Sequence, residues 1–412
     1  MVEVRAIGAD ELEAWVGVTH VAFHGTHSAA DEARIRRERL AQPTPRTLGA
    51  FDDGRLVGTV DTFVTQLTVP GLGTITADAI TSASVLPTHR RRGLLRQLLL
   101  TDLRAAHERG ELASILVAAE YPIYGRFGYG PATQGAVYTL QTASARLRPS
   151  AAAVDGRIEL VEGQEIRRVA PEVFESIRTS HPGQIGRDDW RWDVRAGLSP
   201  SPWGGERASR FAVYRGRDGR AEGYAVYRID PVWEARVPRG TLLLDELMAL
   251  TPAAYTGLWQ YCASVDLIST VRAVMRRPDE PLYWLVDNAR ASMRLEEISD
   301  FLWLRLLDTA ACLGCRSYAT PGQVVLEVHD PLELSGGRFL LEGGPDGARA
   351  TTTQRSADLS IGMDALGAAF LGGPSLRVLH EAGRMDEHTP GAVEQAARMF
   401  GATRAPWCST FF

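Results

Sequence analysis

Apolar side chains near residue 90 change from the period of a strand to the period of a helix. Residues 74–85, TITADAITSASV, are rich in β-branched side chains and predict a strand. Leu95, Leu99 and Leu103 then recur at every fourth position, which predicts an amphipathic helix that begins at or near Arg91. The pattern therefore predicts a strand, a short turn and a helix in direct succession.

Further patterns complete a first unit over residues 1–142. Asp53-Gly54 stands between two apolar runs, as the tight turn of a β-hairpin does. The other predicted elements are a strand at 3–7, helices from Glu11 and at 31–40, and a strand at 115–119. Antiparallel strands followed by one strand-helix-strand crossover predict a mixed sheet.

Residues 143–155 lack periodicity and predict a linker to a second unit that extends to residue 297. The apolar patterns of this unit predict a helix at 166–179, strands at 211–216, 221–229 and 241–249, and a helix at 253–262. Thr251-Pro252 opens the last helix, where the first unit has an Arg- and Gly-rich turn. We expect a degenerate copy of the first unit that does not bind its ligand.

A third unit, residues 298–412, begins with the apolar run 302–314, which predicts an amphipathic helix. The later patterns predict strands at 323–330, 337–341 and 348–353 and helices at 363–371, 374–382 and 392–400. The apolar faces of these helices either line a lipid cavity or close a small core, and the second use is the more common one.

Composition narrows the classes of function. The chain of 412 residues has a net charge of −5, so we expect no nucleic-acid partner, and no apolar stretch reaches the length of a membrane span. The acidic N-terminal residues are unlike a signal peptide, and we expect a cytoplasmic protein. Cys312 and Cys315 form a C-x-x-C pair without the further ligands of a zinc site, so we expect packed thiols and no metal.

The turn between the strand and the helix near residue 90 is the clearest candidate site. Unpaired amides of a first helical turn attract anions, and Gly93 lets a ligand approach the backbone. Positive charge is added by Arg90, Arg91, Arg92 and Arg96. An exposed basic helix start would have the same composition, but the spacing after a strand favours a diphosphate site.

Arg90, Gly93 and Leu95 match the Gln/Arg-x-x-Gly-x-Gly/Ala signature of the GNAT superfamily of N-acetyltransferases, although Leu95 replaces the usual small residue. Two longer segments, PTHRRRGLLR at 87–96 and IYGRFGYGPAT at 123–133, resemble the enhanced intracellular survival (Eis) branch of that superfamily. A weaker similarity continues over most of the chain. The resemblance implies an acetyl-CoA-dependent N-acetyltransferase.

The resemblance also implies an α+β fold of two GNAT-like mixed-sheet domains in tandem, the second lacking the cofactor signature, and a C-terminal sterol-carrier-protein-like domain. The residues expected to bind acetyl-CoA are Ala83, Ser84 and Val85 along the pantetheine, Arg90, Arg91, Arg92, Gly93, Leu94, Leu95 and Arg96 at the diphosphate, and Ala119 and Glu120 after the next strand.

Acetyl transfer to an amine requires an acid for the leaving thiolate and a base for the ammonium. Tyr124 matches the general acid of the family, while Tyr121 and Tyr129 are alternatives on chemistry alone. The family places a terminal α-carboxylate in the active site as the base, which here belongs to Phe412. The other candidate bases are His24, His27 and His89.

The expected substrate is a primary amine of a lysine-like molecule, a polyamine or an aminoglycoside. The segment after the first helix lacks the family's acidic pattern, so Asp31, Glu32, Asp245 and Glu246 are the carboxylates considered as replacements. The family further implies a homohexamer built as a trimer of dimers. An acyl-CoA-binding or lipid-binding sensor or carrier without turnover is the alternative function.

Overall fold

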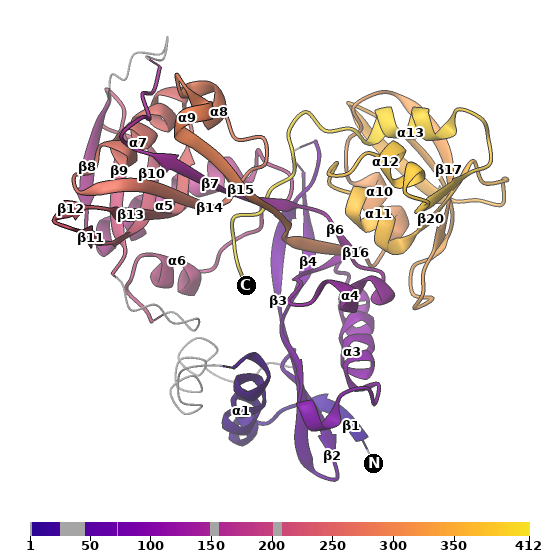
Figure 1. Cartoon of the computed structure of the whole chain (residues 1–412). Coiled ribbons are helices and arrows are strands. Elements are labelled where there is room, and N and C mark those ends of the chain that lie inside the picture. The colour runs from indigo at the N-terminus through magenta and orange to yellow at the C-terminus, as the bar shows by residue number, and fades with distance from the viewer. Residues whose placement is uncertain (1, 25–45, 72, 149–155, 201–207) are drawn as a thin grey trace.

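The computed structural model describes residues 2–24, 46–71, 73–148, 156–200 and 208–412. In these ranges the chain forms two seven-stranded mixed sheets and a five-stranded sheet, each covered by helices, and a two-stranded sheet of β11 (Trp233–Glu234) and β12 (Val237–Pro238) (Figure 1). The helix predicted at 31–40 lies outside the described residues, as do His27, Asp31 and Glu32.

The first sheet has the strand order β1-β2-β3-β4-β5-β16-β6. Its strands are β1 Val2–Ala6, β2 Leu48–Asp52, β3 Arg55–Thr68, β4 Thr74–Val85, β5 Ala113–Val117, β6 Gly130–Pro131 and β16 Leu302–Leu306. Helix α1 (Leu12–Phe23) packs with Phe51 and helix α3 (Leu94–Glu108) packs with Ala50, so the two helices cover opposite faces. The predicted hairpin turn is confirmed, since Asp53 and Gly54 have φ values of 49° and 78°.

The prediction of one helix over 302–314 is wrong. Residues 302–306 form strand β16, which pairs with β5 on one side and β6 on the other, and only α10 (Thr309–Gly314) is helical. All five residues of β16 are buried. A strand covered on both faces shows little alternation between apolar and polar residues, and β16 has Arg305 as its one polar residue, so periodicity alone does not distinguish it from a buried helix.

The second sheet has the strand order β15-β7-β14-β13-β10-β9-β8. Its strands are β7 Gln134–Gln141, β8 Arg157–Val161, β9 Arg210–Arg215, β10 Ala221–Asp230, β13 Gly240–Ala249, β14 Ile268–Arg276 and β15 Met293–Asp300. Helices α5 (Gly163–Arg178), α6 (Asp189–Arg195) and α7 (Pro252–Ser264) accompany it. Thr251 caps α7 and Pro252 occupies its first turn, as the sequence predicts.

The two tandem sheets exchange strands along the chain. Strand β7 lies within the range expected for the first domain, but it pairs with β14 and β15 in the second sheet. Strand β16 lies within the range expected for the third domain, but it completes the first sheet. The three contiguous ranges expected from the sequence therefore do not coincide with the three sheets, because pairing between distant strands leaves no local pattern.

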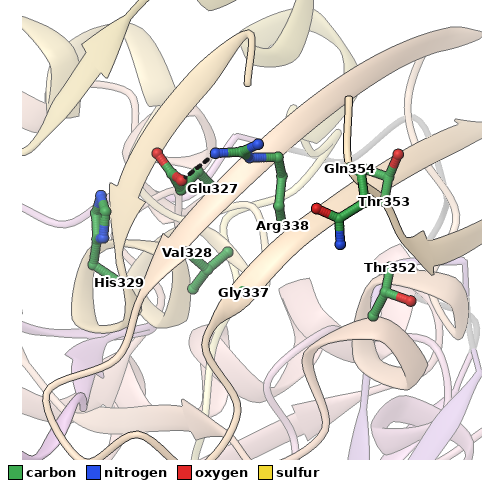
Figure 2. A pocket seen from close by; sticks show the side chains of 8 residues that line it. All are labelled: Glu327, Val328, His329, Gly337, Arg338, Thr352, Thr353 and Gln354. Carbon is green, nitrogen blue, oxygen red and sulfur yellow. Dashed lines mark hydrogen bonds and ion pairs between the residues drawn. The ribbon is translucent and has the colours of Figure 1, made fainter. Parts of the chain in front are cut away.

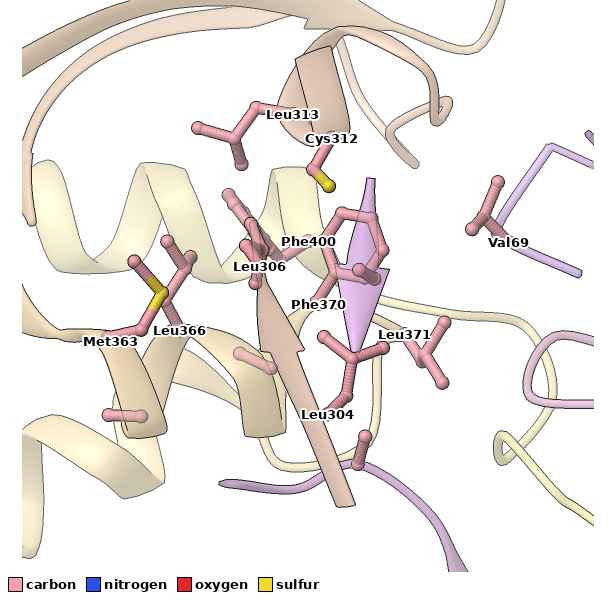
Figure 3. Close-up of a cluster of buried hydrophobic side chains, with 14 of the residues drawn as sticks. Val69, Leu304, Leu306, Cys312, Leu313, Met363, Leu366, Phe370, Leu371 and Phe400 are labelled. Carbon is pink, nitrogen blue, oxygen red and sulfur yellow. The ribbon is translucent and has the colours of Figure 1, made fainter. Parts of the chain in front are cut away.

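The third domain has the strand order β19-β18-β17-β20-β21. Its elements are α10, β17 Gly322–His329, β18 Gly337–Gly344, β19 Gly347–Thr352, β20 Leu359–Gly362, α11 Met363–Ala369, α12 Leu376–Glu381, β21 Met385–Glu387 and α13 Ala392–Phe400. The helices predicted here close a buried core that also contains Leu304 and Leu306 of β16 (Figure 3). A Cβ on Gly130 of β6 would clash with the Asp364 carbonyl oxygen, so α11 packs directly on the first sheet.

Candidate functional site

The backbone of the turn between β4 and α3 enters the left-handed region at two positions. Arg91 has a φ of 64° and Gly93 a φ of 79°, both in the left-handed region. Helix α3 consequently begins at Leu94 rather than near Arg91. Successive amides in such a turn point into one concavity, which favours an anion. A Cβ on Gly93 would meet no described atom within 4 Å, so the space in front of this turn is open.

The arginines of the turn differ in their surroundings. Arg90, Arg91 and Arg96 are exposed. Arg92 donates to the Asp52 carboxylate at 2.8 Å, and this bond lowers the pKa of Asp52. Leu95 is half-buried and packs against the cluster beneath α3, so its larger side chain is accommodated by the core. Positive charge therefore surrounds the turn on its exposed side.

Strands β4 and β5 separate beyond their shared register. Their parallel pairing runs from Ala77 opposite Ala113 to Ile80 opposite Leu116, while β4 continues to Val85 beside β3. Along the chain β4 leads into α3, whereas β5 leads into α4 (Tyr121–Tyr124). The two strands therefore diverge beyond Ile80 and Leu116.

A β-bulge accompanies this divergence. Ser82 has a φ of 55°, and the register between β3 and β4 shifts there. The Thr59 hydroxyl donates to the Ser82 carbonyl at 2.7 Å and lies 2.6 Å from the Ser84 hydroxyl oxygen. Sequence reasoning missed this bulge, because Ser82 stands in an ordinary β-branched run. Ala83, Ser84 and Val85 follow it on the diverging part of β4.

Three tyrosines follow β5 and occupy different environments. Tyr124, in α4 (Tyr121–Tyr124), is 6% exposed, and burial, assisted by the charge of Glu120, raises its pKa to about 12. Tyr121 is 61% exposed and lies with its ring edge against Trp303. Ala119 and Glu120 are exposed residues between β5 and α4. Tyr124 is therefore a largely buried, neutral phenol at the end of β5.

Tyr129 is fully buried beneath this helix. Its hydroxyl lies 2.7 Å from the Ser114 hydroxyl, which in turn donates to Asp78 at 3.2 Å. Its ring is T-shaped to that of Tyr124, with centroids 6.2 Å apart. Burial raises the pKa of both Asp78 and its neighbour Asp102. Neither carboxyl was predicted from the sequence as a site residue, although Asp78 is the one charged residue of β4.

The C-terminal residue lies against the first sheet. Phe412 is 7% exposed, and its ring packs edge-on to Phe63 of β3 with centroids 5.5 Å apart. Phe412 shares an apolar cluster with Ala79 and Ile115. Figure 1 likewise shows the C-terminus ending beside β3, far in sequence from the strands around it.

Tyr124 and Phe412 belong to opposite faces of this sheet. Tyr124 shares its cluster with Ile80 of β4 and Leu116 of β5. Phe412 shares its cluster with Ala79 and Ile115, which directly precede those two residues in the same strands. Successive residues of a strand point to opposite faces. The phenol and the terminal residue therefore approach the diverging strands from the two sides.

The other carboxylates and histidines considered from the sequence are engaged elsewhere or exposed. Asp245 pairs with Arg228 at 2.7 Å, and buried Glu246 pairs with Arg187 at 2.6 Å, so neither supplies a free negative charge for an amine. His24 is an exposed residue at the end of α1. His89 lies at the basic turn, 3.6 Å from Asp52.

Of the two C-x-x-C residues, Cys312 lies in α10 and Cys315 directly follows its last residue. The Cys312 thiol donates to the Leu112 carbonyl, and the Cys315 thiol donates to the Cys312 carbonyl, each at 3.0 Å. Burial raises the pKa of Cys315 to about 11, and burial also raises the pKa of Cys312 well above that of a free thiol. Both groups are therefore protonated thiols held by backbone oxygens.

A separate hollow of about 540 Å³ opens on the third domain (Figure 2). It is lined by Glu327, Val328, His329, Gly337, Arg338, Thr352, Thr353 and Gln354. Arg338 donates to Glu327 at 2.7 Å across it. This charged pair makes the hollow a poor match for an apolar lipid chain.

Family models match three successive parts of the chain. An acetyltransferase (GNAT) domain matches residues 3–132, a second acetyltransferase (GNAT) domain matches residues 183–306, and a sterol carrier protein domain matches residues 309–409. The expected fold, two tandem GNAT domains and a sterol-carrier-like domain, is confirmed. Among the described residues, no helix is long and apolar enough to cross a membrane.

The chain is similar over most of its length to named N-acetyltransferases. An uncharacterized N-acetyltransferase of Streptomyces griseus is 41% identical over 415 residues, covering 100% of this chain and 99% of that protein. N-acetyltransferase Eis of Mycobacterium tuberculosis is 33% identical over 341 residues, covering 82% and 81%. Eis1 of Mycobacterium abscessus superposes with a TM-score of 0.84 at 32% identity, covering 100% of both chains.

Proposed function

The chain belongs to the Eis family of GNAT N-acetyltransferases, and from this premise we propose that it transfers an acetyl group from acetyl-CoA directly to a primary amine. The proposal rests on one arrangement: the left-handed Arg91 and Gly93 precede α3 at the end of β4, where β4 diverges from β5. The fold is that of acyl-CoA-dependent enzymes, and acetyl-CoA is the donor proposed within that class.

The proposed donor site follows the diverging strand. Amides of Ala83, Ser84 and Val85 would pair with the pantetheine, and the turn from Arg90 to Arg96 would hold the diphosphate. Leu94 contributes an amide there, and Ala119 and Glu120 border the other side of the gap. The open space before Gly93 is consistent with this placement.

We assign Tyr124 the role of general acid. Its pKa of about 12 keeps the phenol protonated at neutral pH, so it has a proton to give to a departing thiolate. Exposed Tyr121 and Ser114-bonded Tyr129 are less suited to this task.

We assign the α-carboxylate of Phe412 the role of general base. Phe412 is 7% exposed and its ring packs against Phe63, and burial of a carboxylate in general favours proton uptake. Its approach from the face opposite Tyr124 separates the base from the acid. One group would then take a proton from the ammonium while the other returns a proton to sulfur.

The proposed acceptors are primary amines of lysine-like molecules, polyamines or aminoglycosides. Asp245 and Glu246 are each paired with an arginine, so neither carboxylate favours a polycationic substrate. A lysine-like amine is therefore as well supported as an aminoglycoside.

Release of free thiol from acetyl-CoA, measured against a panel of these three amine classes, tests the proposed activity. We expect amine-dependent thiol release with at least one class. Tight acetyl-CoA binding without thiol release on the whole panel, together with lipid that co-purifies with the protein, would instead support a sensor or carrier.

We further propose a homohexamer, arranged as a trimer of dimers, and a cytoplasmic location, as the family resemblance implies. Light scattering coupled to size-exclusion chromatography tests the assembly. A mass of one or two chains at micromolar concentration would contradict it.

A further inference from the structure

Residues 405–410 of the C-terminal segment are held by the second domain, before Phe412 reaches the first sheet. Trp407 is 3% exposed, Cys408 0% and Thr410 3%. The Trp407 amide donates to the Pro182 carbonyl at 2.9 Å. The Ser409 hydroxyl donates to the Gln184 side-chain oxygen at 3.0 Å. Backbone, hydroxyl and aromatic groups of the segment are thus all engaged by the same domain.

Trp407 occupies the place where the second sheet opens. The parallel pairing of β13 and β14 ends with Leu244 opposite Ala273, just as the pairing of β4 and β5 ends before the proposed donor site. Beyond that point the Trp407 indole donates to the Met275 carbonyl at 2.7 Å. The Arg276 guanidinium lies 5.5 Å from the indole ring and donates to the Leu247 carbonyl of β13 at 2.7 Å. Side chains of this protein therefore close the second gap.

Arg187 binds the next two residues of the segment, Ser409 and Thr410. Its guanidinium is paired with buried Glu246 of β13 at 2.6 Å and stacks 4.0 Å from the Phe174 ring centroid. The same guanidinium donates to the Thr410 hydroxyl at 2.9 Å and to the Ser409 hydroxyl at 3.3 Å. A buried ion pair is costly unless further hydrogen bonds satisfy it, and residues 409–410 supply them.

The residues that hold the segment also fix the first sheet. The Gly183 amide donates to the Thr68 carbonyl of β3, and the Thr68 amide donates to the Gln184 carbonyl. Gly183 has a φ of 93°, and a Cβ there would lie 3.0 Å from the Trp407 nitrogen. Residues 182–187 therefore connect the C-terminal segment to the strand that carries Phe63.

We propose that the second GNAT-like domain anchors residues 405–410, and that Arg187 and Trp407 are positioning residues for the terminal carboxylate. This inference rests on the proposed role of Phe412. The domain without the cofactor signature thereby contributes to the reaction. Where its strands β13 and β14 diverge, it binds the C-terminal segment of the chain instead of a donor molecule. The anchor sets the distance from which Phe412 reaches the diverging strands of the first sheet.

The experiment weakens the anchor without leaving a buried charge unpaired. The double variant Ser409→Ala/Thr410→Val removes two acceptors of Arg187, while Glu246 remains bound to it. Trp407→Phe removes the bond to the Met275 carbonyl and keeps an aromatic ring. Thr403→Val is the matched control, because Thr403 is exposed and lies before the anchored residues.

Two readouts are compared in the full-length protein. The first is the initial rate at which a carboxypeptidase that prefers aromatic residues releases Phe412, which requires no catalysis by this enzyme. We expect it to rise about tenfold in both anchor variants, because lost hydrogen bonds favour local opening. The second is thiol release, where we expect kcat to fall about tenfold while the KM for acetyl-CoA stays within about twofold.

The outcomes separate this inference from the proposed function. Faster Phe412 release with a lower kcat, and neither change in Thr403→Val, supports the anchor. Unchanged Phe412 release in both anchor variants overturns it, and so does faster release with unchanged kcat. Wild-type protein without any thiol release refutes the proposed function instead, while the carboxypeptidase rates still decide whether the segment is anchored.

Discussion

Two side chains from distant parts of the chain meet the diverging strands β4 and β5 from opposite faces. Tyr124 is buried with Ile80 and Leu116, and Phe412 with Ala79 and Ile115. Burial raises the pKa of the phenol, which keeps it protonated, and apolar packing favours proton uptake by a carboxylate. At this scale the acid and base assignments depend on local solvation.

Tyr124→Phe should lower kcat by about 100-fold, because a positioned general acid contributes a factor of this order or more. The KM for acetyl-CoA should change little, since the variant retains the ring. Tyr121→Phe is the matched control and should retain wild-type rates, because Tyr121 is mostly exposed. Steady-state thiol release measures both. Equal losses in the two variants would contradict the assignment.

His181 makes the anchor of the C-terminal segment sensitive to acid. Its ring faces Trp407, and its Nε2 lies 3.3 Å from the Ala405 carbonyl oxygen. Burial, together with the charge of Arg277, lowers its pKa to about 4. In the unfolded chain His181 takes up a proton near pH 6.5, whereas in the folded chain it does so only near pH 4. The free energy of unfolding therefore decreases as pH falls from about 6.5 to about 4.

His181→Gln should remove this loss. Lowering the pH from 7 to 5 should cost the wild type about 2 kcal/mol more unfolding free energy than it costs the variant. Denaturant unfolding at the two pH values measures the difference. The same pH dependence in both proteins would show that His181 is protonated in the folded state.

At the scale of elements, the turn before α3 and the bulge in β4 shape the proposed donor site. The turn was predictable, because Arg-x-x-Gly after a β-branched strand and before a helical period is specific. The start of α3 at Leu94 was not predictable, because an arginine gives no sign in the sequence that its backbone is left-handed. The bulge at Ser82 was likewise invisible, because it depends on how β3 pairs beside it.

Gly93→Ala should weaken acetyl-CoA binding, and Gly110→Ala is a closely matched control. Both glycines have a φ of 79°, and a Cβ on either meets no described atom within 4 Å. Each substitution should cost about 1 kcal/mol of stability through backbone strain. Only Gly93→Ala should raise the Kd for acetyl-CoA, measured by calorimetry. Equal Kd values for both variants would exclude the turn as a binding element.

At the scale of the whole molecule, the three domains depend on one another. Strands β7 and β16 cross between the expected units, and the C-terminal segment returns from the third domain across the second to the first (Figure 1). Domain number and order could be predicted from repeated patterns. The strand exchange could not, because β16 has no alternation and β7 pairs with strands more than 100 residues away.

A buried ion pair joins the third domain to the turn after Tyr124. Arg305 of β16 donates to Asp330 at 2.7 Å and to the Phe127 carbonyl at 2.6 Å, with both charged side chains no more than 1% exposed. Asp330→Asn would leave the Arg305 charge buried without its carboxylate. This loss should reduce the unfolding free energy by about 3 kcal/mol.

Asp364→Asn provides the comparison, because the Asp364–Arg384 pair lies near the surface and should contribute less than about 1 kcal/mol. Calorimetric unfolding of the two variants measures these costs. If Asp330→Asn were no more destabilising than Asp364→Asn, the third domain would not be held by Arg305.

The central claim is that the α-carboxylate of Phe412 acts as the base opposite Tyr124, and one glycine added after Phe412 tests it most directly. The addition moves the carboxylate away while leaving the anchored residues and the donor site intact. We predict that kcat for thiol release falls at least about 100-fold, with the Kd for acetyl-CoA unchanged. Wild-type turnover by the extended chain would contradict the claim.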